Sequence, residues 1–117
     1  MACILVVDDD SEVRFVLRTG LERRGHEVVE ADDGDTALRH PELTRVDAIV
    51  TDLIMPGSGV RFVQAVRRQG LAVPIIVVSG RVSELDWQQV GEPGVSAFLE
   101  KPVALDRLLR TLDELLP

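Results

Sequence analysis

Four short apolar runs in this chain lead into side chains that can bind a cation or a phosphoryl group. The runs cover residues 3–7, 47–51, 74–78 and 95–99. The polar residues that follow them are Asp8, Asp9 and Asp10, then Asp52, then Ser79, and finally Glu100 and Lys101. Carboxylates are ligands that Mg²⁺ prefers, and a lysine ammonium binds phosphoryl oxygens. If the fold gathers these ends, they form a site for a metal ion and a phosphoryl group.

The apolar runs alternate with helical patterns, which predicts five β-α units and a parallel sheet with helices on both faces. The expected strands are 3–7, 27–31, 47–51, the run after Pro74, and 96–99. The expected helices are 11–24, 34–40, 60–69, a short fourth helix that starts near Ser83, and a fifth with a leucine stripe (Leu105, Leu108, Leu109, Leu112, Leu115 and Leu116). In an open parallel sheet, ligands bind outside the carboxyl ends of the strands, so the polar residues above are expected to converge there.

Composition and charge exclude several classes of function. The chain has 117 residues, of which 45% are hydrophobic, and this is enough for one domain with its own core. Its net charge of -7 argues against sequence-independent nucleic-acid binding and against docking on an anionic membrane. Cys3 is the single cysteine, so an internal disulfide is excluded. No apolar run approaches the ~20 residues of a membrane span, and no signal peptide is recognised, so we expect a cytoplasmic protein.

Each candidate site residue also has a structural interpretation. The run of three acids could simply cap the first helix, Ser79 could cap a turn, and Lys101 could form a surface ion pair with Glu100. Taken together, the acids, the hydroxyl and the lysine at four strand ends favour a site. Converging carboxylates would repel one another unless a cation lay among them, and a lysine beside Asp52 would neutralise it.

The motifs that carry these residues resemble the receiver domain of two-component response regulators. They are Ile4-Leu5-Val6-Val7-Asp8-Asp9-Asp10, Asp52-Leu53-Ile54-Met55-Pro56-Gly57, Val78-Ser79-Gly80 and Phe98-Leu99-Glu100-Lys101-Pro102. The resemblance spans essentially the whole chain, so we interpret residues 1–117 as one receiver domain with no output domain in this chain. It implies a five-stranded parallel sheet of order 2-1-3-4-5, the order of a chemotaxis receiver that serves as a reference for this topology.

The resemblance also implies a role for each matching residue. Asp52 would be the phosphoacceptor, and Lys101 and Ser79 would bind the phosphoryl group. Mg²⁺ would be the cofactor, and its ligands would be Asp8, Asp9, Asp52 and the backbone carbonyl of Ile54. Ser79 and Phe98 would act as switch residues, and the Lys101-Pro102 peptide would be cis. Such a protein catalyses only its own phosphorylation and dephosphorylation, so it is not an enzyme in the usual sense.

The expected partners follow from the same resemblance. A sensor histidine kinase or a histidine phosphotransfer protein would donate the phosphoryl group. An unidentified downstream protein would read the face formed by the fourth helix, fifth strand and fifth helix, through which the chain could also homodimerise. Trp87 in the fourth helix is either a packing residue or an exposed anchor on this face.

The chain departs from the family pattern after Asp52, where the loop is one residue shorter and lacks an Asp-Gly pair. Ile54 and Arg81 occupy positions that tune hydrolysis in the family, and an apolar Ile54 predicts slow self-dephosphorylation. Two other functions stay open. One is a phosphatase similar to haloacid dehalogenases, with Asp8 as its nucleophile. The other is a pseudo-receiver that binds partners without being phosphorylated.

Overall fold

The computed structural model of the chain describes residues 2–53, 59–80 and 94–117. The strands are β1 (Cys3–Val7), β2 (Glu27–Ala31), β3 (Ala48–Thr51), β4 (Ile75–Ser79) and β5 (Ala97–Glu100). The helices are α1 (Ser11–Arg23), α2 (Gly34–Leu38), α3 (Gly59–Arg68) and α5 (Leu105–Leu115). The predicted fourth helix, with Trp87, and the shortened loop after Asp52 lie outside the described residues.

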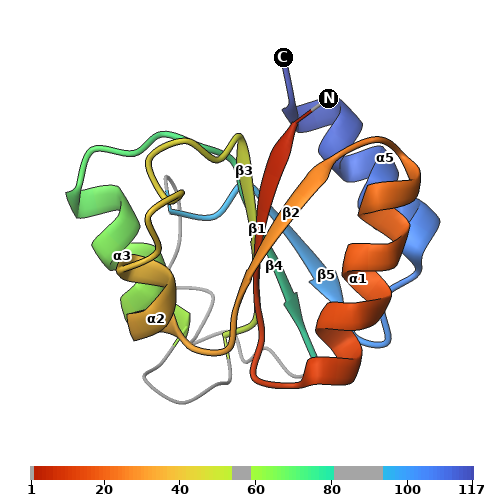
Figure 1. Cartoon of the computed structure of the whole chain (residues 1–117), viewed down its shortest axis with the longest axis horizontal. Helices are drawn as coiled ribbons and strands as arrows, with labels where there is room; N and C mark the ends of the chain where they lie inside the picture. Colours follow the sequence, from red (N-terminus) through yellow and green to blue (C-terminus); the bar gives the residue numbers. More distant parts are fainter. Residues whose placement is uncertain (1, 54–58, 81–93) are drawn as a thin grey trace.

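The strands form one parallel sheet in the order β2-β1-β3-β4-β5, which confirms the predicted fold. Helices α1 and α5 cover one face of the sheet, and α2 and α3 cover the other (Figure 1). The carboxyl ends of the strands lie along the lower edge of this view, whereas both chain termini lie at the upper edge. The site predicted from the strand ends therefore has to lie at the lower edge.

Alternation along the strands divides the core between the two faces. Ile4 and Val6 of β1 belong to the cluster under α1 and α5, whereas Leu5 and Val7 belong to the cluster under α2 and α3. Because both faces are covered, β1, β3 and β4 are almost continuously apolar, as is typical of parallel sheets. This burial fixes the strands, and hence the positions at which they end.

Local signals set the ends of the helices. The Asp10 side chain caps α1 by accepting hydrogen bonds from the amides of Glu12 and Val13, and Gly25 follows the helix with a positive φ of 87°. Helix α5 lacks such a cap, because Ala104 precedes it. Helix α2 ends at Leu38, two residues before the predicted end at His40. Within the described residues, no helix is long and apolar enough to cross a membrane.

Candidate functional site

Two of the three candidate metal ligands follow β1. Asp8 is buried, with 2% of its surface exposed, whereas Asp9 is exposed. The Asp8 Oδ1 atom accepts a hydrogen bond of 2.9 Å from the Asp10 amide, which tightens the turn between β1 and α1. The three adjacent acids thus take different positions: Asp8 points into the site, Asp9 lies at its rim, and Asp10 caps the helix.

Asp52 follows β3, next to β1 in the sheet. It is 6% exposed, and its amide donates a hydrogen bond of 3.0 Å to the Val7 carbonyl oxygen. This bond continues the pairing of β3 with β1 past the last ladder residue, Thr51. It brings the Asp52 carboxylate beside the acids at the end of β1.

Lys101 joins the carboxylates of two strands. It follows β5, and its Nζ atom lies 2.8 Å from Asp8 Oδ2 and 2.8 Å from Asp52 Oδ2. Its amide donates a hydrogen bond of 2.9 Å to the carbonyl oxygen of Ser79, the last residue of β4. This bond holds the Lys101 backbone beside the end of β4. The Lys101-Pro102 peptide is cis, as predicted. Lys101 therefore forms partly buried ion pairs with Asp8 and Asp52, which argues against the alternative that it serves only in a surface pair with Glu100.

The surroundings shift the pKa of both members of the Asp8–Lys101 pair. Burial raises the pKa of the Asp8 carboxyl, although the hydrogen bonds from Lys101 and from the Asp10 amide oppose this shift. For Lys101, burial acts to lower the pKa, but the hydrogen bonds and charges of Asp52 and Asp8 outweigh it and raise that pKa. Lys101 is thus a cation at neutral pH, held between two buried carboxyl groups.

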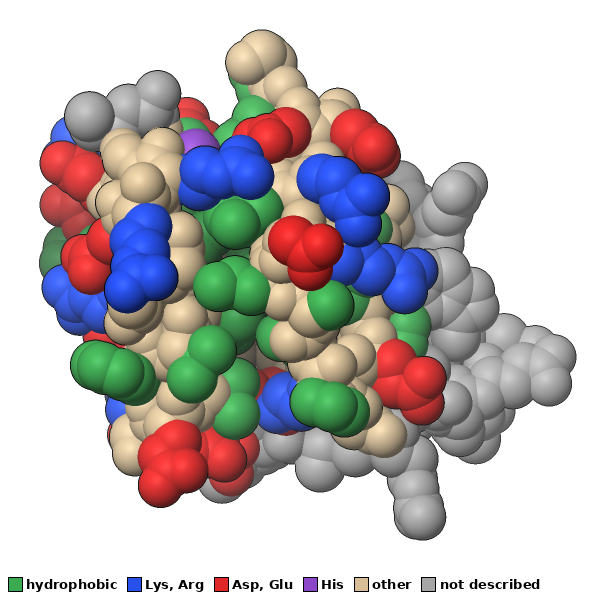
Figure 2. Space-filling view, turned by 90° about the vertical axis from the view of Figure 1, so that its right-hand side faces the viewer, with side chains coloured by type: hydrophobic (Ala, Val, Ile, Leu, Met, Phe, Trp, Pro, Cys, Tyr) green, Lys and Arg blue, Asp and Glu red, His purple; other side chains and the backbone are tan. Residues whose placement is uncertain are grey.

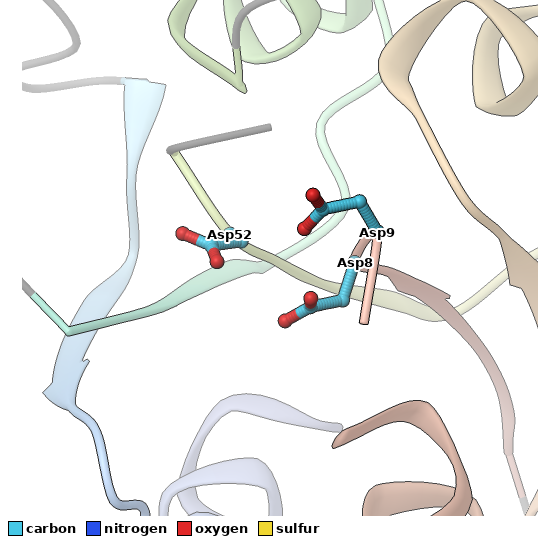
Figure 3. Close-up of side chains that lie close together, drawn as sticks. All are labelled: Asp8, Asp9 and Asp52. Atoms are coloured by element: carbon cyan, nitrogen blue, oxygen red, sulfur yellow. The ribbon is translucent and has the colours of Figure 1, made fainter. Parts of the chain in front are cut away.

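The three carboxylates Asp8, Asp9 and Asp52 lie around a common space. Each offers one oxygen, and these oxygens lie within 4.8 Å of one another. Figure 3 shows the Asp8 and Asp9 side chains extending from the end of β1 toward the side on which Asp52 lies. Hard oxygen donors from two or three carboxylates fit the preferences of Mg²⁺, and such a cation would relieve their mutual repulsion. The residues present therefore fit the predicted metal.

Ser79 and Phe98 complete the predicted set at the other strands. Ser79 is fully buried at the end of β4, where it pairs in register with Glu100. Phe98 is half-buried on β5 and packs against the core cluster under α2 and α3. The backbone carbonyl of Ile54 and the side chain of Arg81 lie outside the described residues, so their predicted roles stay predictions.

An apolar cavity of about 500 Å³ opens beside Lys101 on the face that carries α1 and α5. It is lined by Val13, Val16 and Leu17 of α1, by Pro102 and Val103, and by Lys101, Asp10 and Glu12. Figure 2 shows hydrophobic side chains gathered between these two helices and acidic side chains at the lower end. Phe15 and Val16 of α1 are 68% and 53% exposed. This surface was not predicted from the sequence.

Arg14, which was also not predicted from the sequence, contacts the site from the side of β2. Its Nη1 atom donates a hydrogen bond of 2.6 Å to the backbone carbonyl oxygen of Asp8. No spacing rule separates this arginine from the other cations of α1, which are exposed. Its position on the same helical face as Val13 and Leu17 was the available signal.

Comparisons with known proteins agree with this geometry. A sequence profile of the response regulator receiver domain matches residues 4–113. The transcriptional regulatory protein PrrA of Mycobacterium leprae is 44% identical over 97% of this chain and 49% of its own length. The solved structure of chemotaxis protein CheY4 of Vibrio cholerae superposes with a TM-score of 0.90, at 35% identity and with 99% of each chain covered. The chain spans about half the length of the first curated relatives that it matches.

Proposed function

Because the chain belongs to the response regulator receiver domain family, we propose that it accepts a phosphoryl group on Asp52 and thereby switches a signalling surface. One observation carries this proposal. The Lys101 ammonium lies 2.8 Å from the carboxylates of both Asp8 and Asp52, at the strand ends where Asp9 also lies. Asp52 is thus a buried carboxylate beside a fixed cation and a candidate Mg²⁺ site, a setting that suits a nucleophile.

In the proposed reaction, one Asp52 carboxylate oxygen bonds to the phosphorus of a phosphohistidine. The P–N bond of the donor breaks, and the released imidazole nitrogen takes up a proton from solvent. Lys101 is already held beside Asp52 and binds an oxygen of the transferred group, while Asp8 and Asp9 would hold Mg²⁺. The metal would supply charge neutralisation for that group, so catalysis consists chiefly of positioning and electrostatics.

The partner is proposed to be a sensor histidine kinase or a histidine phosphotransfer protein. Receiver domains act with histidine kinases, and the apolar cavity beside Lys101 is a suitable contact for a donor that reaches Asp52. Ser79 and Phe98 are proposed to transmit phosphorylation to the face that includes β5 and α5, which a downstream protein or a second copy would bind. PrrA is a transcriptional regulator, but the charge of -7 gives this domain no evident affinity for DNA. A cytoplasmic location remains part of the proposal.

The decisive experiment is to incubate the protein with Mg²⁺ and a small acyl phosphate, and to locate the modified residue by mass spectrometry after borohydride trapping. We expect the label on Asp52 in the wild-type protein, and none in the Asp52→Asn variant or in the presence of a chelator. A label on Asp8 would instead support the phosphatase alternative, which the family match disfavours. A wild-type protein that stays unlabelled would support the pseudo-receiver and contradict the proposal.

A further inference from the structure

Arg14 holds the backbone between the two acids that follow β1. Its side chain is 19% exposed, and its Nη1 atom donates a hydrogen bond of 2.6 Å to the Asp8 carbonyl oxygen. This oxygen belongs to the peptide group that joins Asp8 to Asp9. Because a peptide group is planar, a bond that fixes the carbonyl also fixes the direction in which the chain enters Asp9.

Other bonds hold the remaining parts of Asp8. Its amide donates to the Ala31 carbonyl oxygen at 3.2 Å, its Oδ1 accepts from the Asp10 amide at 2.9 Å, and its Oδ2 lies 2.8 Å from Lys101 Nζ. These contacts fix the position of Asp8 and of its carboxylate. None of them involves the Asp8 carbonyl oxygen, so they do not fix the orientation of the peptide group that follows. Arg14 binds that oxygen, and Asp9 is the exposed ligand that depends on it.

Glu30 in turn fixes the Arg14 guanidinium. Its Oε1 lies 3.0 Å from Arg14 Nε, and its Oε2 lies 2.6 Å from Arg18 Nη1. Glu30 lies on β2 opposite Val6 of β1, so the carboxylate that binds Arg14 is carried by the sheet. Since Arg14, Arg18, Glu22 and Glu30 together carry no net charge, the effect of Arg14 on the acids is expected to come from position rather than from added positive charge.

We propose that Arg14 is a positioning residue for the Mg²⁺ site, and this inference rests on the proposed function. By holding the Asp8–Asp9 peptide, Arg14 keeps the exposed Asp9 carboxylate turned toward Asp8 and Asp52. Groups that orient the ligands of a metal typically change its affinity by 10–100-fold when they are removed. Arg14 does so through a backbone carbonyl instead of through a ligand side chain.

The test is to compare Arg14→Met with Arg18→Met by calorimetric titration with Mg²⁺. The two variants are matched, because both residues lie on α1 and both pair with Glu30. In the described structure the bonds of Arg18 go to Glu30 and Glu22, whereas Arg14 also reaches the Asp8 carbonyl. We expect Arg14→Met to weaken Mg²⁺ binding by roughly tenfold and Arg18→Met to stay near the wild-type value.

Two measurements on metal-free protein separate positioning from a general loss of stability. Urea unfolding should show comparable, small losses in the two variants. The ¹⁵N chemical shift of the Asp9 amide, which adjoins the Asp8 carbonyl, should move in Arg14→Met and stay in place in Arg18→Met.

A third variant, Arg14→Lys, keeps a donor and the charge, so it should recover part of the Mg²⁺ affinity.

The inference is overturned if Arg14→Met binds Mg²⁺ as the wild type does, or if Arg18→Met weakens binding equally. Wild-type protein that bound no Mg²⁺ would instead contradict the proposed function, and this inference with it. Binding by the wild type that Asp9→Asn abolishes and Arg14→Met leaves intact would overturn the positioning role alone.

Discussion

Four polar residues are buried among the described residues, and all four lie near the carboxyl ends of strands. They are Asp8, Thr51, Asp52 and Ser79. Burying a charged carboxylate is unfavourable unless a partner compensates, and breaking a buried pair leaves an uncompensated charge. Lys101 supplies that partner for Asp8 and Asp52 at once. The unfavourable groups are thus confined to the edge where the proposed chemistry takes place.

The raised pKa of Asp8 predicts a pH dependence of stability in metal-free protein. A carboxyl whose pKa is higher in the folded protein than its ordinary value of 3.8 binds protons more readily when folded. Its contribution to the free energy of unfolding is therefore full below 3.8 and is lost as the pH rises through the folded pKa. Lys101, whose pKa is also raised, loses its contribution only at alkaline pH, above its ordinary value of 10.5.

The measurement is urea unfolding of wild type and Asp8→Asn from acid to neutral pH in the presence of a chelator. Relative to Asp8→Asn, the wild-type protein should become less stable as the pH rises. Terms common to both proteins cancel in this difference, including any constant effect of the altered hydrogen bonds. A difference that is independent of pH, or that grows in favour of the wild type, would contradict the prediction.

At this scale the sequence predicted which side chains meet, but not how each is held. Asp8, Asp9, Asp52 and Lys101 could be identified because they stand within two residues of the end of an apolar run, and parallel strands bring such ends together. The division of roles among three adjacent acids depends on the turn into α1, where Asp10 becomes the helix cap. Arg14 was not identified, because its place on the inward side of α1 does not reveal that it reaches the backbone oxygen of Asp8.

At the scale of elements, the start of α3 lies directly against the backbone that carries Asp52. A Cβ atom on Gly59 would collide with the Asp52 carbonyl oxygen and the Leu53 Cα atom, and the Gly59 amide donates a hydrogen bond of 3.0 Å to the Leu53 carbonyl oxygen. Gly20 of α1 is also crowded, but its Cβ would meet the side-chain end of Leu105. A backbone cannot move aside as a leucine methyl group can.

We therefore predict different outcomes for alanine at these two glycines. Gly59→Ala should lower the free energy of unfolding by about 1–3 kcal/mol, as overpacking does, and should slow the labelling of Asp52. Gly20→Ala should cost less, because Leu105 can rotate and because alanine favours a helix interior by roughly 0.5–1 kcal/mol over glycine. Urea unfolding and the labelling assay measure both effects. Equal stabilities of the two variants would show that α3 can shift away from Asp52 without cost.

Among the described residues, the sequence placed the strands and helices to within a few residues, and tertiary contacts explain some of the differences. Strand β3 begins at Ala48 instead of residue 47. The Asp47 side chain accepts a hydrogen bond of 2.7 Å from the Cys3 amide. At the start of the β1–β3 pairing, this carboxylate therefore binds the Cys3 amide. Strand β5 is displaced by one residue, to Ala97–Glu100, where Glu100 pairs with Ser79. Apolar patterns do not encode such register.

At the scale of the whole molecule, a single sheet separates two cores of similar size. One core lies under α2 and α3 and includes Phe62, and the other lies under α1 and α5 and includes Leu112. The regular alternation of apolar runs with helical patterns predicted that both faces would be covered. The strand order 2-1-3-4-5 came from the family resemblance, because many orders satisfy the same alternation. The central strands β1, β3 and β4 contribute side chains to both cores, so each core depends on the same backbone.

This shared sheet predicts that the chain unfolds in one cooperative transition, as expected for a domain that folds on its own, although it spans about half the length of relatives such as PrrA. Its radius of gyration of 12.6 Å is that of a compact domain of this length. Phe62→Ala and Leu112→Ala should each lower the stability by about 2–5 kcal/mol. Each should shift the whole transition, because removing atoms from either core weakens the strands on which the other is built.

Calorimetry and far-ultraviolet circular dichroism provide the measurement. The calorimetric and van't Hoff enthalpies should agree for the wild type and for both variants, and the thermal midpoints from the two methods should coincide. If Phe62→Ala produced a separate early transition while the α1–α5 side stayed folded, the two faces would be independent. In that case the Asp52 site, whose residues come from strands shared by both faces, would lose its rigid support before the molecule unfolded.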